Sequence, residues 1–182
     1  MNASQLAKRL RLPLGFVFGI LYFWLAPRWA TPERLVIGAI VAALGLFVRG
    51  WAAGHIVKNR ELATTGPYAH VRNPLYFGSF LLAAGFAIAA HPLLLVFVAL
   101  FWAVIYFPTM ERERQHILGR FPDTYPAFAK NVPLFVPRLT PWRQPGVTGE
   151  RWSASLYMKH REWQAALVYV AAIVWIAVRM DR

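Results

Sequence analysis

Two short polar stretches carry the residues that could do chemistry in this chain of 182 residues. The first is the segment 66–78, which contains Gly66, Tyr68, His70, Arg72, Tyr76 and Gly78. Its Gly and Pro residues predict a turn, Asn73 is restricted to extended conformations by the proline after it, and Pro74 suits the first turn of a helix. The turn therefore delivers charged and aromatic side chains to the start of an apolar run, and its glycines allow close approach of backbone or ligand.

The second stretch is the segment 111–117, which follows the next apolar run and contains Glu111, Arg112, Glu113, Arg114 and His116. Acidic residues are scarce, with 8 in the whole chain, and two of them fall here. One interpretation is a polar site at a membrane face, built from both stretches. The other is ordinary flanking charge, because residues three and four apart on a helix pair at its surface.

The composition places the chain among membrane proteins. It is 58% hydrophobic with a mean hydropathy of +0.40, which is too apolar for an ordinary soluble domain of this size. A net charge of +12 fits a face toward anionic lipid, and the long apolar runs leave no soluble core to carry a nucleic-acid-binding patch. Without cysteine there are no disulfides and no thiolate chemistry, and the His, Asp and Glu residues show no metal-ligand spacing, so no metal is expected.

The apolar runs predict an all-α integral membrane protein with about five spans, at residues 12–26, 34–53, 75–90, 93–108 and 164–178. Thr31-Pro32-Glu33 has the residue types of a helix cap and first turn. His91-Pro92 is so short a break that the spans beside it must form an antiparallel hairpin. A short interfacial helix is expected within residues 54–65, and a loop over residues 140–149.

The distribution of basic residues predicts the orientation. With the N-terminus in the cytoplasm, the inner segments hold 16 Lys and Arg residues, and the outer segments hold Arg28, Arg34, Arg179 and Arg182. This asymmetry favours a cytoplasmic N-terminus, a C-terminus on the opposite side and both polar stretches at the cytoplasmic face. A small-molecule cofactor bound there would be a cytosolic one.

Two further residues are candidates for substrate contact. Arg49 lies inside the far end of the second predicted span, where a charged side chain is costly and marks a functional site by default. The alternative is that its long stem snorkels to the interface. For His55, the sequence favours a ligand-facing role and a structural role equally.

The combined motifs resemble the signature of the isoprenylcysteine carboxyl methyltransferase family, which is related to the phospholipid N-methyltransferases. The resemblance rests on Gly66-Pro67-Tyr68, Arg72-Asn73-Pro74-Leu75-Tyr76 and Gly78, on Glu113-Arg114, Ile117, Phe121, Tyr125, Phe128, Val132-Pro133 and Pro137, and on Arg49, Trp51, Gly54-His55, Lys58 and Leu62. It covers about residues 44–138, and Arg161-Glu162-Trp163-Gln164 looks like bacterial members, which implies the bacterial inner membrane with a periplasmic C-terminus.

The resemblance implies a single membrane methyltransferase domain over residues 1–182, with a cofactor pocket at the cytoplasmic face and no Rossmann sheet. Residues 1–65 would form the first two spans and their lead-in, 66–138 the catalytic core, and 139–182 a loop and the last span. The implied cofactor is S-adenosylmethionine and the implied partners are membrane lipids and a lipophilic acceptor. The implied catalytic residues are Arg72 and Glu113, the substrate-contacting residues are Arg49, His55 and Arg72, and the cofactor-binding residues are Gly66, Pro67, Tyr68, Asn73, Pro74, Tyr76, Gly78, Glu113 and Tyr125.

The acceptor remains open between two chemistries. A carboxylate, as in an isoprenylcysteine-like or other lipidic acid, would be oriented by the Arg72 guanidinium and would need no base. An amine, as in a phospholipid N-methyltransferase, would require a proton acceptor such as Glu111, His70 or His116. Glu113 can pair with the ammonium of the cofactor, and Tyr68, Tyr76 or Tyr125 can face its adenine or sulfonium.

The chain departs from the best-known family members at two places. It has Asn73-Pro74 where they have His-Pro, and Glu113-Arg114 where they have Glu-Glu, with Glu111 two residues earlier. The second departure supports a third hypothesis, in which the chain is an inactive membrane scaffold or adaptor that kept the fold.

Overall fold

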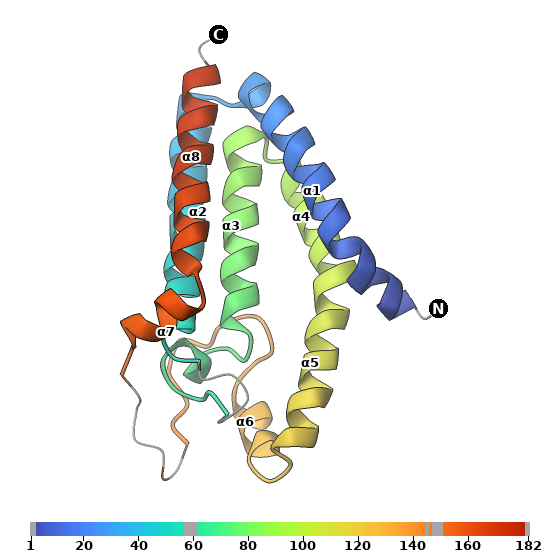
Figure 1. The fold of residues 1–182 in the computed structure, drawn as a ribbon, viewed down its shortest axis with the longest axis vertical. Coiled ribbons are helices and arrows are strands. Elements are labelled where there is room, and N and C mark those ends of the chain that lie inside the picture. Colours follow the sequence, from blue (N-terminus) through green and yellow to red (C-terminus); the bar gives the residue numbers. More distant parts are fainter. Residues whose placement is uncertain (1–2, 57–61, 145, 147–150, 181–182) are drawn as a thin grey trace.

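The structure is a computed structural model that describes residues 3–56, 62–144, 146 and 151–180. Its elements, in chain order, are α1 (Ala3–Trp29), α2 (Pro32–Ala53), η1 (Gly66–Ala69), α3 (Pro74–Ala90), α4 (Leu94–Phe101), η2 (Trp102–Tyr106), α5 (Phe107–Arg120), α6 (Tyr125–Asn131), α7 (Ala154–Lys159) and α8 (Glu162–Met180). No strand occurs in these residues, which confirms the predicted all-α class. Figure 1 shows α2, α3 and α8 side by side, with α1 inclined to them and the short helices α6 and α7 at the lower end.

Three helices among the described residues are long and apolar enough to cross a membrane: α2, the continuous helix Leu94–Arg120, and α8. The apolar helix α3 is shorter, with 17 residues, and the count of five spans stays a prediction. The outward faces are apolar, as on α2, where Val36, Ile40 and Phe47 are 59%, 58% and 67% exposed. Contiguous apolar surface of this kind needs a partner, and a lipid bilayer supplies it.

The start of α2 agrees with the predicted cap. Thr31 has extended backbone angles, and its hydroxyl accepts a bond of 3.4 Å from the N–H of Arg34. Pro32 occupies the first helical position and Glu33 the first turn, where a proline loses no bond and an acid meets the positive end of the helix dipole.

Helices α2 and α3 pack backbone to backbone through small residues. A Cβ added to Gly45 would lie 2.5 Å from the carbonyl oxygen of Gly78, and one added to Gly85 would lie 2.5 Å from that of Gly38. In a bilayer, where water drives no apolar association between helices, close backbone contact of this kind is a main source of attraction. Helices α2 and α3 are therefore closely packed, and the polar turn lies directly before α3 in the chain.

The helix from Leu94 to Arg120 contains one turn of π-helix, η2. The N–H of Phe107 donates to the carbonyl oxygen of Trp102, five residues earlier. Pro108 follows directly, and a proline inside an α-helix would lack a donor and clash with a carbonyl one turn before it. The wider turn removes this conflict. The fourth predicted span and the polar stretch after it are consequently one helix, which carries Glu113 beyond the apolar part.

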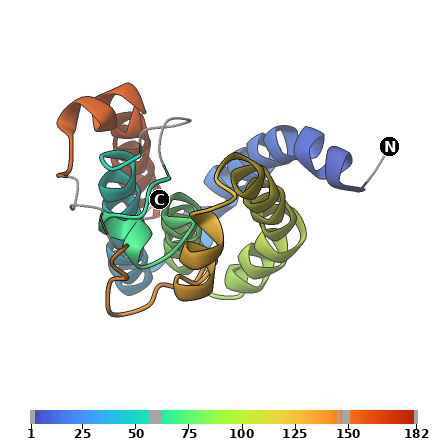
Figure 2. The ribbon, with the colours of Figure 1, turned by 90° about the horizontal axis from the view of Figure 1, so that it is seen from below.

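The polar end of the molecule is closed by α6 and by the segment 132–142. Tyr125, Phe128 and Val132 form a buried cluster there, packed against α5 and Trp142. Figure 2 shows this end from below, with α6 close to the foot of α5. The interfacial helix expected within residues 54–65 is not found at 54–56 or 62–65. Lys58, Arg60 and Glu61 lie outside the described residues, as do residues 145 and 147–149 of the loop expected at 140–149.

Candidate active site

The side chain of His55 packs against the turn η1 at Gly66. Gly66 has a φ of +57°, in the left-handed region that favours glycine, and a Cβ there would lie 2.7 Å from the His55 ring. His55 is 6% exposed, and its Nδ1 lies 2.9 Å from the carbonyl oxygen of Trp51. The structure thus places the predicted substrate residue His55 behind the turn, where it lines neither of the two cavities described below.

Backbone bonds to the segment 133–138 hold the residues after η1. The N–H of Arg72 donates to the carbonyl oxygen of Pro133 over 2.9 Å, and the amide of Asn73 donates to that of Leu134 over 3.1 Å. His70 and Arg138 add two contacts, one from the Arg138 N–H to the His70 carbonyl and one between the His70 ring and the Arg138 carbonyl oxygen. The side chains of His70 and Asn73 are therefore used in fixing the backbone from which Arg72 projects.

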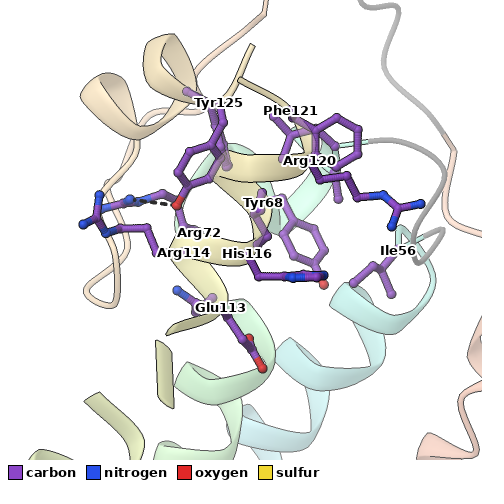
Figure 3. A pocket seen from close by; sticks show the side chains of 14 residues that line it. Ile56, Tyr68, Arg72, Glu113, Arg114, His116, Arg120, Phe121 and Tyr125 are labelled. Atoms are coloured by element: carbon purple, nitrogen blue, oxygen red, sulfur yellow. Dashed lines mark hydrogen bonds between the residues drawn. The ribbon is translucent and has the colours of Figure 1, made fainter. Parts of the chain in front are cut away.

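A cavity of about 320 Å³ opens between η1, α5 and α6, and we call it the polar cavity. Figure 3 shows its side chains, with Tyr68 and His116 near the centre of the view. Three arginines and one carboxylate belong to its wall, so it favours negatively charged groups. It is lined by Ile56, Leu62, Ala63, Tyr68, Arg72, Asn73, Glu113, Arg114, His116, Ile117, Arg120, Phe121, Tyr125 and Phe128.

Two buried polar atoms of this wall lack a hydrogen-bond partner among the described residues, the hydroxyl of Tyr68 and Nε of Arg72. Tyr68 is 6% exposed. Burial raises the pKa of its phenol above the ordinary value, and the charges of Glu113 and Glu162 act in the same direction. The hydroxyl therefore stays protonated at neutral pH and can donate. Because buried polar groups are normally bonded, both atoms indicate a polar ligand in the cavity.

Two tyrosines connect the charged residues of the site. Nη1 of Arg72 donates to the hydroxyl of Tyr125 over 3.1 Å, as the dashed line in Figure 3 marks. The hydroxyl of Tyr76 donates to the Glu113 carboxylate over 2.7 Å, which joins α3 to α5. Arg72 and Glu113, the two predicted catalytic residues, thus both line the polar cavity.

A second cavity, of about 660 Å³, lies beside the first, and we call it the charged chamber. Ile56 and Glu113 line both spaces, so the two cavities adjoin at these residues. The chamber is bordered by the end of α2, by the starts of α3 and α8, and by α1, η2 and α5. Its lining consists of Gly15, Phe16, Arg49, Ile56, Leu75, Tyr76, Ser79, Tyr106, Glu113 and Glu162.

Arg49 and Glu162 form a bidentate ion pair in this chamber. Nε and Nη2 of Arg49 donate to the two carboxylate oxygens of Glu162 over 2.9 and 2.8 Å, and Nη1 donates to the hydroxyl of Ser79. The side chains are 23% and 11% exposed. Glu162 follows Arg161, whose φ is +57°, and this reversal sets Glu162 in the first turn of α8. The pairing directs the Arg49 side chain toward α3 and α8.

Several other residues predicted for the site have structural surroundings. Gly66, Pro67, Pro74 and Gly78 line neither cavity, and a Cβ on Gly78 would lie 2.7 Å from Cγ of Arg49. Glu111, a proposed base for an amine acceptor, is instead bonded to Nε of Arg114 at 2.9 Å on the outer face of α5. That is the helical pairing expected for flanking charge.

The sequence analysis assigned no role to Glu162 or Ser79. One sequence feature could have indicated a role for Glu162. It is an acid at the start of an apolar run, and the chain has only 8 acids. Ser79 had none, because a serine inside an apolar helix commonly bonds its own backbone, as Ser79 does to the Leu75 carbonyl over 2.8 Å. No group of three or more potential metal ligands occurs in the part of the chain that the structure describes.

The model of the phospholipid methyltransferase family matches residues 33–124, from the first turn of α2 to the residue before α6. The chain belongs to this family. Arg49, Tyr68, Arg72 and Glu113 all lie inside the matched segment, whereas α1 and Glu162 lie outside it. The family consists of membrane methyltransferases, so the resemblance found in the sequence is confirmed at this level.

Curated relatives extend the comparison. The chain is 30% identical over 135 residues to the nickel-cobalt-cadmium resistance protein NccN of Alcaligenes xylosoxydans xylosoxydans, covering 72% of this chain and 59% of that protein. It is 32% identical to the cobalt-zinc-cadmium resistance protein CzcN of Cupriavidus metallidurans, covering 63% and 54%. It is 28% identical to the protein-S-isoprenylcysteine O-methyltransferase of Schizosaccharomyces pombe, covering 57% and 46%. The chain thus spans about half the length of these relatives, and no solved structure matches it significantly.

Proposed function

We propose that this protein transfers a methyl group from S-adenosylmethionine to a lipophilic acceptor at the membrane face. The observation that carries the proposal is the pair of adjoining cavities. The polar cavity has unpartnered buried donors, and the charged chamber lies between apolar helices. Glu113 and Ile56 line both, so a group held in one cavity can meet a group held in the other.

The polar cavity fits the cofactor by size and by donor set. Its volume of about 320 Å³ lies within the range of roughly 300–1,000 Å³ for small-molecule sites. Bound S-adenosylmethionine would supply a methyl group on a cationic sulfonium. Glu113 would pair with its ammonium, Arg72 with its carboxylate, and Tyr68 and Tyr125 offer aromatic faces and hydroxyls to the rest.

The charged chamber would hold the head of the acceptor. Our first candidate reaction is carboxyl O-methylation, because the Arg49 fork already binds one carboxylate, that of Glu162, in bidentate geometry. An acceptor carboxylate would take the place of Glu162 on the Arg49 guanidinium. Its oxygen would form a bond to the methyl group as the methyl–sulfur bond breaks, with S-adenosylhomocysteine as the leaving group. A carboxylate carries no proton at neutral pH, so no base is required. The residues would serve mainly to align the reactants and exclude water.

N-methylation is the second candidate, and the charge of the chamber favours it. Two carboxylates, Glu113 and Glu162, face one arginine there, which gives an excess of negative charge that suits an ammonium head. An amine must lose a proton to attack, and the released Glu162 carboxylate would be placed to accept it. The same step would make Glu162 essential for an amine and dispensable for a carboxylate.

Cofactor binding tests the proposal directly. Detergent-purified protein would be titrated with S-adenosylhomocysteine in a calorimeter, beside Glu113→Gln, Tyr68→Phe and Glu111→Gln. Loss of the Glu113 charge should weaken binding by at least about tenfold, or about 1.4 kcal/mol. Loss of the Tyr68 hydroxyl should cost roughly three- to tenfold, the worth of one hydrogen bond. Glu111→Gln is the matched control, since Glu111 lies two residues from Glu113 but outside the cavity.

Absence of binding by folded wild-type protein would contradict the methyltransferase proposal and favour the scaffold hypothesis. If binding is present, labelled methyl groups recovered in extracted acceptor decide between the two reactions. A methyl ester is released by mild base, whereas an N-methyl group is retained.

The proposed setting is the bacterial inner membrane, with a cytoplasmic N-terminus, a periplasmic C-terminus and five spans. The chain contains no cysteine, so single cysteines at residues 31, 92, 123 and 180 would be unique reporters. A membrane-impermeant thiol reagent should label residues 31, 92 and 180 from the periplasm in intact spheroplasts, and residue 123 only after lysis. Labelling of residue 123 before lysis would contradict the proposed topology and indicate the opposite orientation.

A further inference from the structure

After α6 the chain returns to the start of α3 through residues 133–137, which begin and end with proline and which we call the proline segment. The carbonyl oxygen of Pro133 accepts from the N–H of Arg72 at 2.9 Å, and that of Leu134 accepts from the amide of Asn73 at 3.1 Å. In Figure 1 the chain after α6 rises to the foot of α3. The proline segment is therefore bonded directly to the backbone from which Arg72 projects.

Phe135, at the centre of the proline segment, lies between two long helices. Its ring centroid is 5.8 Å from that of Phe77 and 5.6 Å from that of Phe80, both on α3. On the other side it is 5.5 Å from the ring centroid of Phe107, at the start of α5. The ring thus contacts α3 and α5 together.

This contact lies at the level of helices that could cross a membrane. Phe80 is about 9 Å along α3 from the start of that helix. Its neighbour Leu81 faces α2, where a Cβ added to Gly45 would lie 3.1 Å from the Cβ of Leu81. Helix α2 is long and apolar enough to span a bilayer. We therefore expect the ring of Phe135 beside the apolar part of these helices, near one edge of the bilayer.

The outward side of the proline segment is apolar. Val136 is 69% exposed, and Phe107, which packs on Phe135, is 41% exposed. Val104, three residues before Phe107, is 65% exposed and belongs to a candidate span. Because Phe135 contacts Phe107, the apolar surface of that span continues onto the proline segment. A basic residue, Arg138, follows directly, as is common where a chain leaves the apolar part of a bilayer for its headgroups.

The backbone of the proline segment suits the boundary of a bilayer and not its centre. Proline has no N–H, so residues 133 and 137 have no donor to satisfy. The N–H groups of Leu134, Phe135 and Val136 donate to no acceptor in the part of the chain that the structure describes. Unpaired donors are costly in hydrocarbon, whereas water and the ester and phosphate oxygens of lipids can accept from them at the level of the headgroups.

We propose that the proline segment inserts into the leaflet nearest the polar cavity and that this contact with lipid holds the backbone of Arg72 in place. The backbone of the segment lies among the headgroups, and the side chains of Phe135 and Val136 reach the acyl chains. The partner is the lipid surface itself. The proposal needs neither cofactor nor acceptor, so it is independent of the proposed methyl transfer.

The depth of Val136 is measured on the full chain, which contains no cysteine. Val136→Cys is labelled with the fluorophore NBD and placed in phosphatidylcholine nanodiscs that include a lipid with a nitroxide near the top of one acyl chain. Leu100→Cys, 59% exposed in a candidate span, is the reference for hydrocarbon. Asp123→Cys, in the exposed turn before α6, is the reference for water.

The nitroxide should lower the emission from residue 136 at least about threefold and leave that from residue 123 unchanged. With the nitroxide moved to the end of the acyl chain, residue 100 should be quenched more and residue 136 less. This pattern would place Val136 in the upper part of the leaflet.

The link to Arg72 is tested by hydrogen exchange in the same nanodiscs. Val136→Asp places a charge on the surface assigned to lipid, whereas the same change at an exposed position in water has little effect. Exchange of the Arg72 N–H, followed in peptides that cover it, should accelerate at least about threefold. Val136→Leu should match the wild type. Ala127→Asp is the matched control, because Ala127 is exposed on α6 and lines neither the polar cavity nor the charged chamber.

Equal quenching at residues 136 and 123 would overturn the insertion, because water would then cover Val136. So would a blue-shifted emission that no nitroxide lipid quenches, which would assign the surface to a protein, such as a second copy of this chain. Unchanged exchange at Arg72 in Val136→Asp would overturn the link between the bilayer and the site. None of these measurements uses S-adenosylhomocysteine, so failure of the proposed methyl transfer would leave each of them decisive.

Discussion

Two pairs of neighbouring helices in this protein pack in opposite ways. Helices α2 and α3 present glycine and alanine to each other, and their backbones touch. Helices α1 and α4 meet through large rings, with Phe18 and Phe97 at a centroid distance of 4.7 Å, and an apolar cavity of about 530 Å³ lies between α1, α3 and α4. The two pairs differ in the size of the facing side chains. Small residues let α2 and α3 approach closely, whereas aromatic rings lie between α1 and α4.

The strongest test of this contrast is a pair of glycine substitutions. Gly85→Leu inserts a side chain where a Cβ would already lie 2.5 Å from the Gly38 carbonyl oxygen, so we expect a loss of stability of about 3 kcal/mol or more. Gly19→Leu projects into open space and should change stability by less than about 1 kcal/mol. Unfolding in mixed detergent and SDS measures both. Similar losses in the two variants would contradict the contrast.

A smaller loss is expected where the α2–α3 pair is tied to α8. Glu162→Gln leaves Arg49 partly buried without its counter-charge. Breaking a buried pair costs about 3–5 kcal/mol, and with 23% and 11% exposure of the two side chains we expect about 2 kcal/mol here. The same unfolding assay measures it.

The double variant Arg49→Met with Glu162→Met provides the control for this pair. Removing both charges should restore most of the lost stability while abolishing methyl transfer. Full activity in the double variant would exclude the charged chamber as the acceptor head site.

The aromatic contact between α1 and α4 should contribute less to stability. Phe18→Ala removes ring contacts to Phe97 and Phe101, at 4.7 and 6.1 Å between centroids. Because Phe18 is only half-buried, we expect a loss of stability of about 1–2 kcal/mol. Substitution of a fully buried phenylalanine by alanine costs about 3–5 kcal/mol. Thermal unfolding measures this loss.

The smallest effect is expected for Trp102→Phe. The indole N–H has no partner among the described residues, so its removal loses no hydrogen bond. The buried ring stacks on Tyr106 at 4.1 Å between centroids, and its smaller replacement should cost about 1 kcal/mol of stability. Thermal unfolding measures this change too, and a loss larger than that of Phe18→Ala would contradict the expected order.

Local patterns allowed much of the framework to be predicted. The cap at Thr31, the helix start at Pro74 and the break at His91-Pro92 each depend on a few adjacent residues, and the structure agrees with them. The motif around Arg72 and Glu113 was enough to predict the family. Both residues line one cavity, as expected for parts of a single site, although they are 41 positions apart.

The parts that could not be predicted depend on long-range packing. Arg49 and Glu162 are 113 positions apart, and no local pattern indicates which acid a membrane arginine meets. His55 had a residue type suited to catalysis, but only its contact with Gly66 shows that it supports the turn. The continuity of the fourth span with α5 depended on a π-helical turn, which accommodates Pro108 in a way that residue preferences do not reveal.

The sequence by itself determined that the chain is helical, apolar, basic on the predicted cytoplasmic side and related to membrane methyltransferases. Those properties follow from hydropathy, charge and short motifs, which are local or additive along the chain. Only the tertiary structure decided which side chains share a cavity, because this depends on how each helix is rotated and how closely it approaches its neighbour. Glycines set that distance for α2 and α3, and aromatic rings set it for α1 and α4.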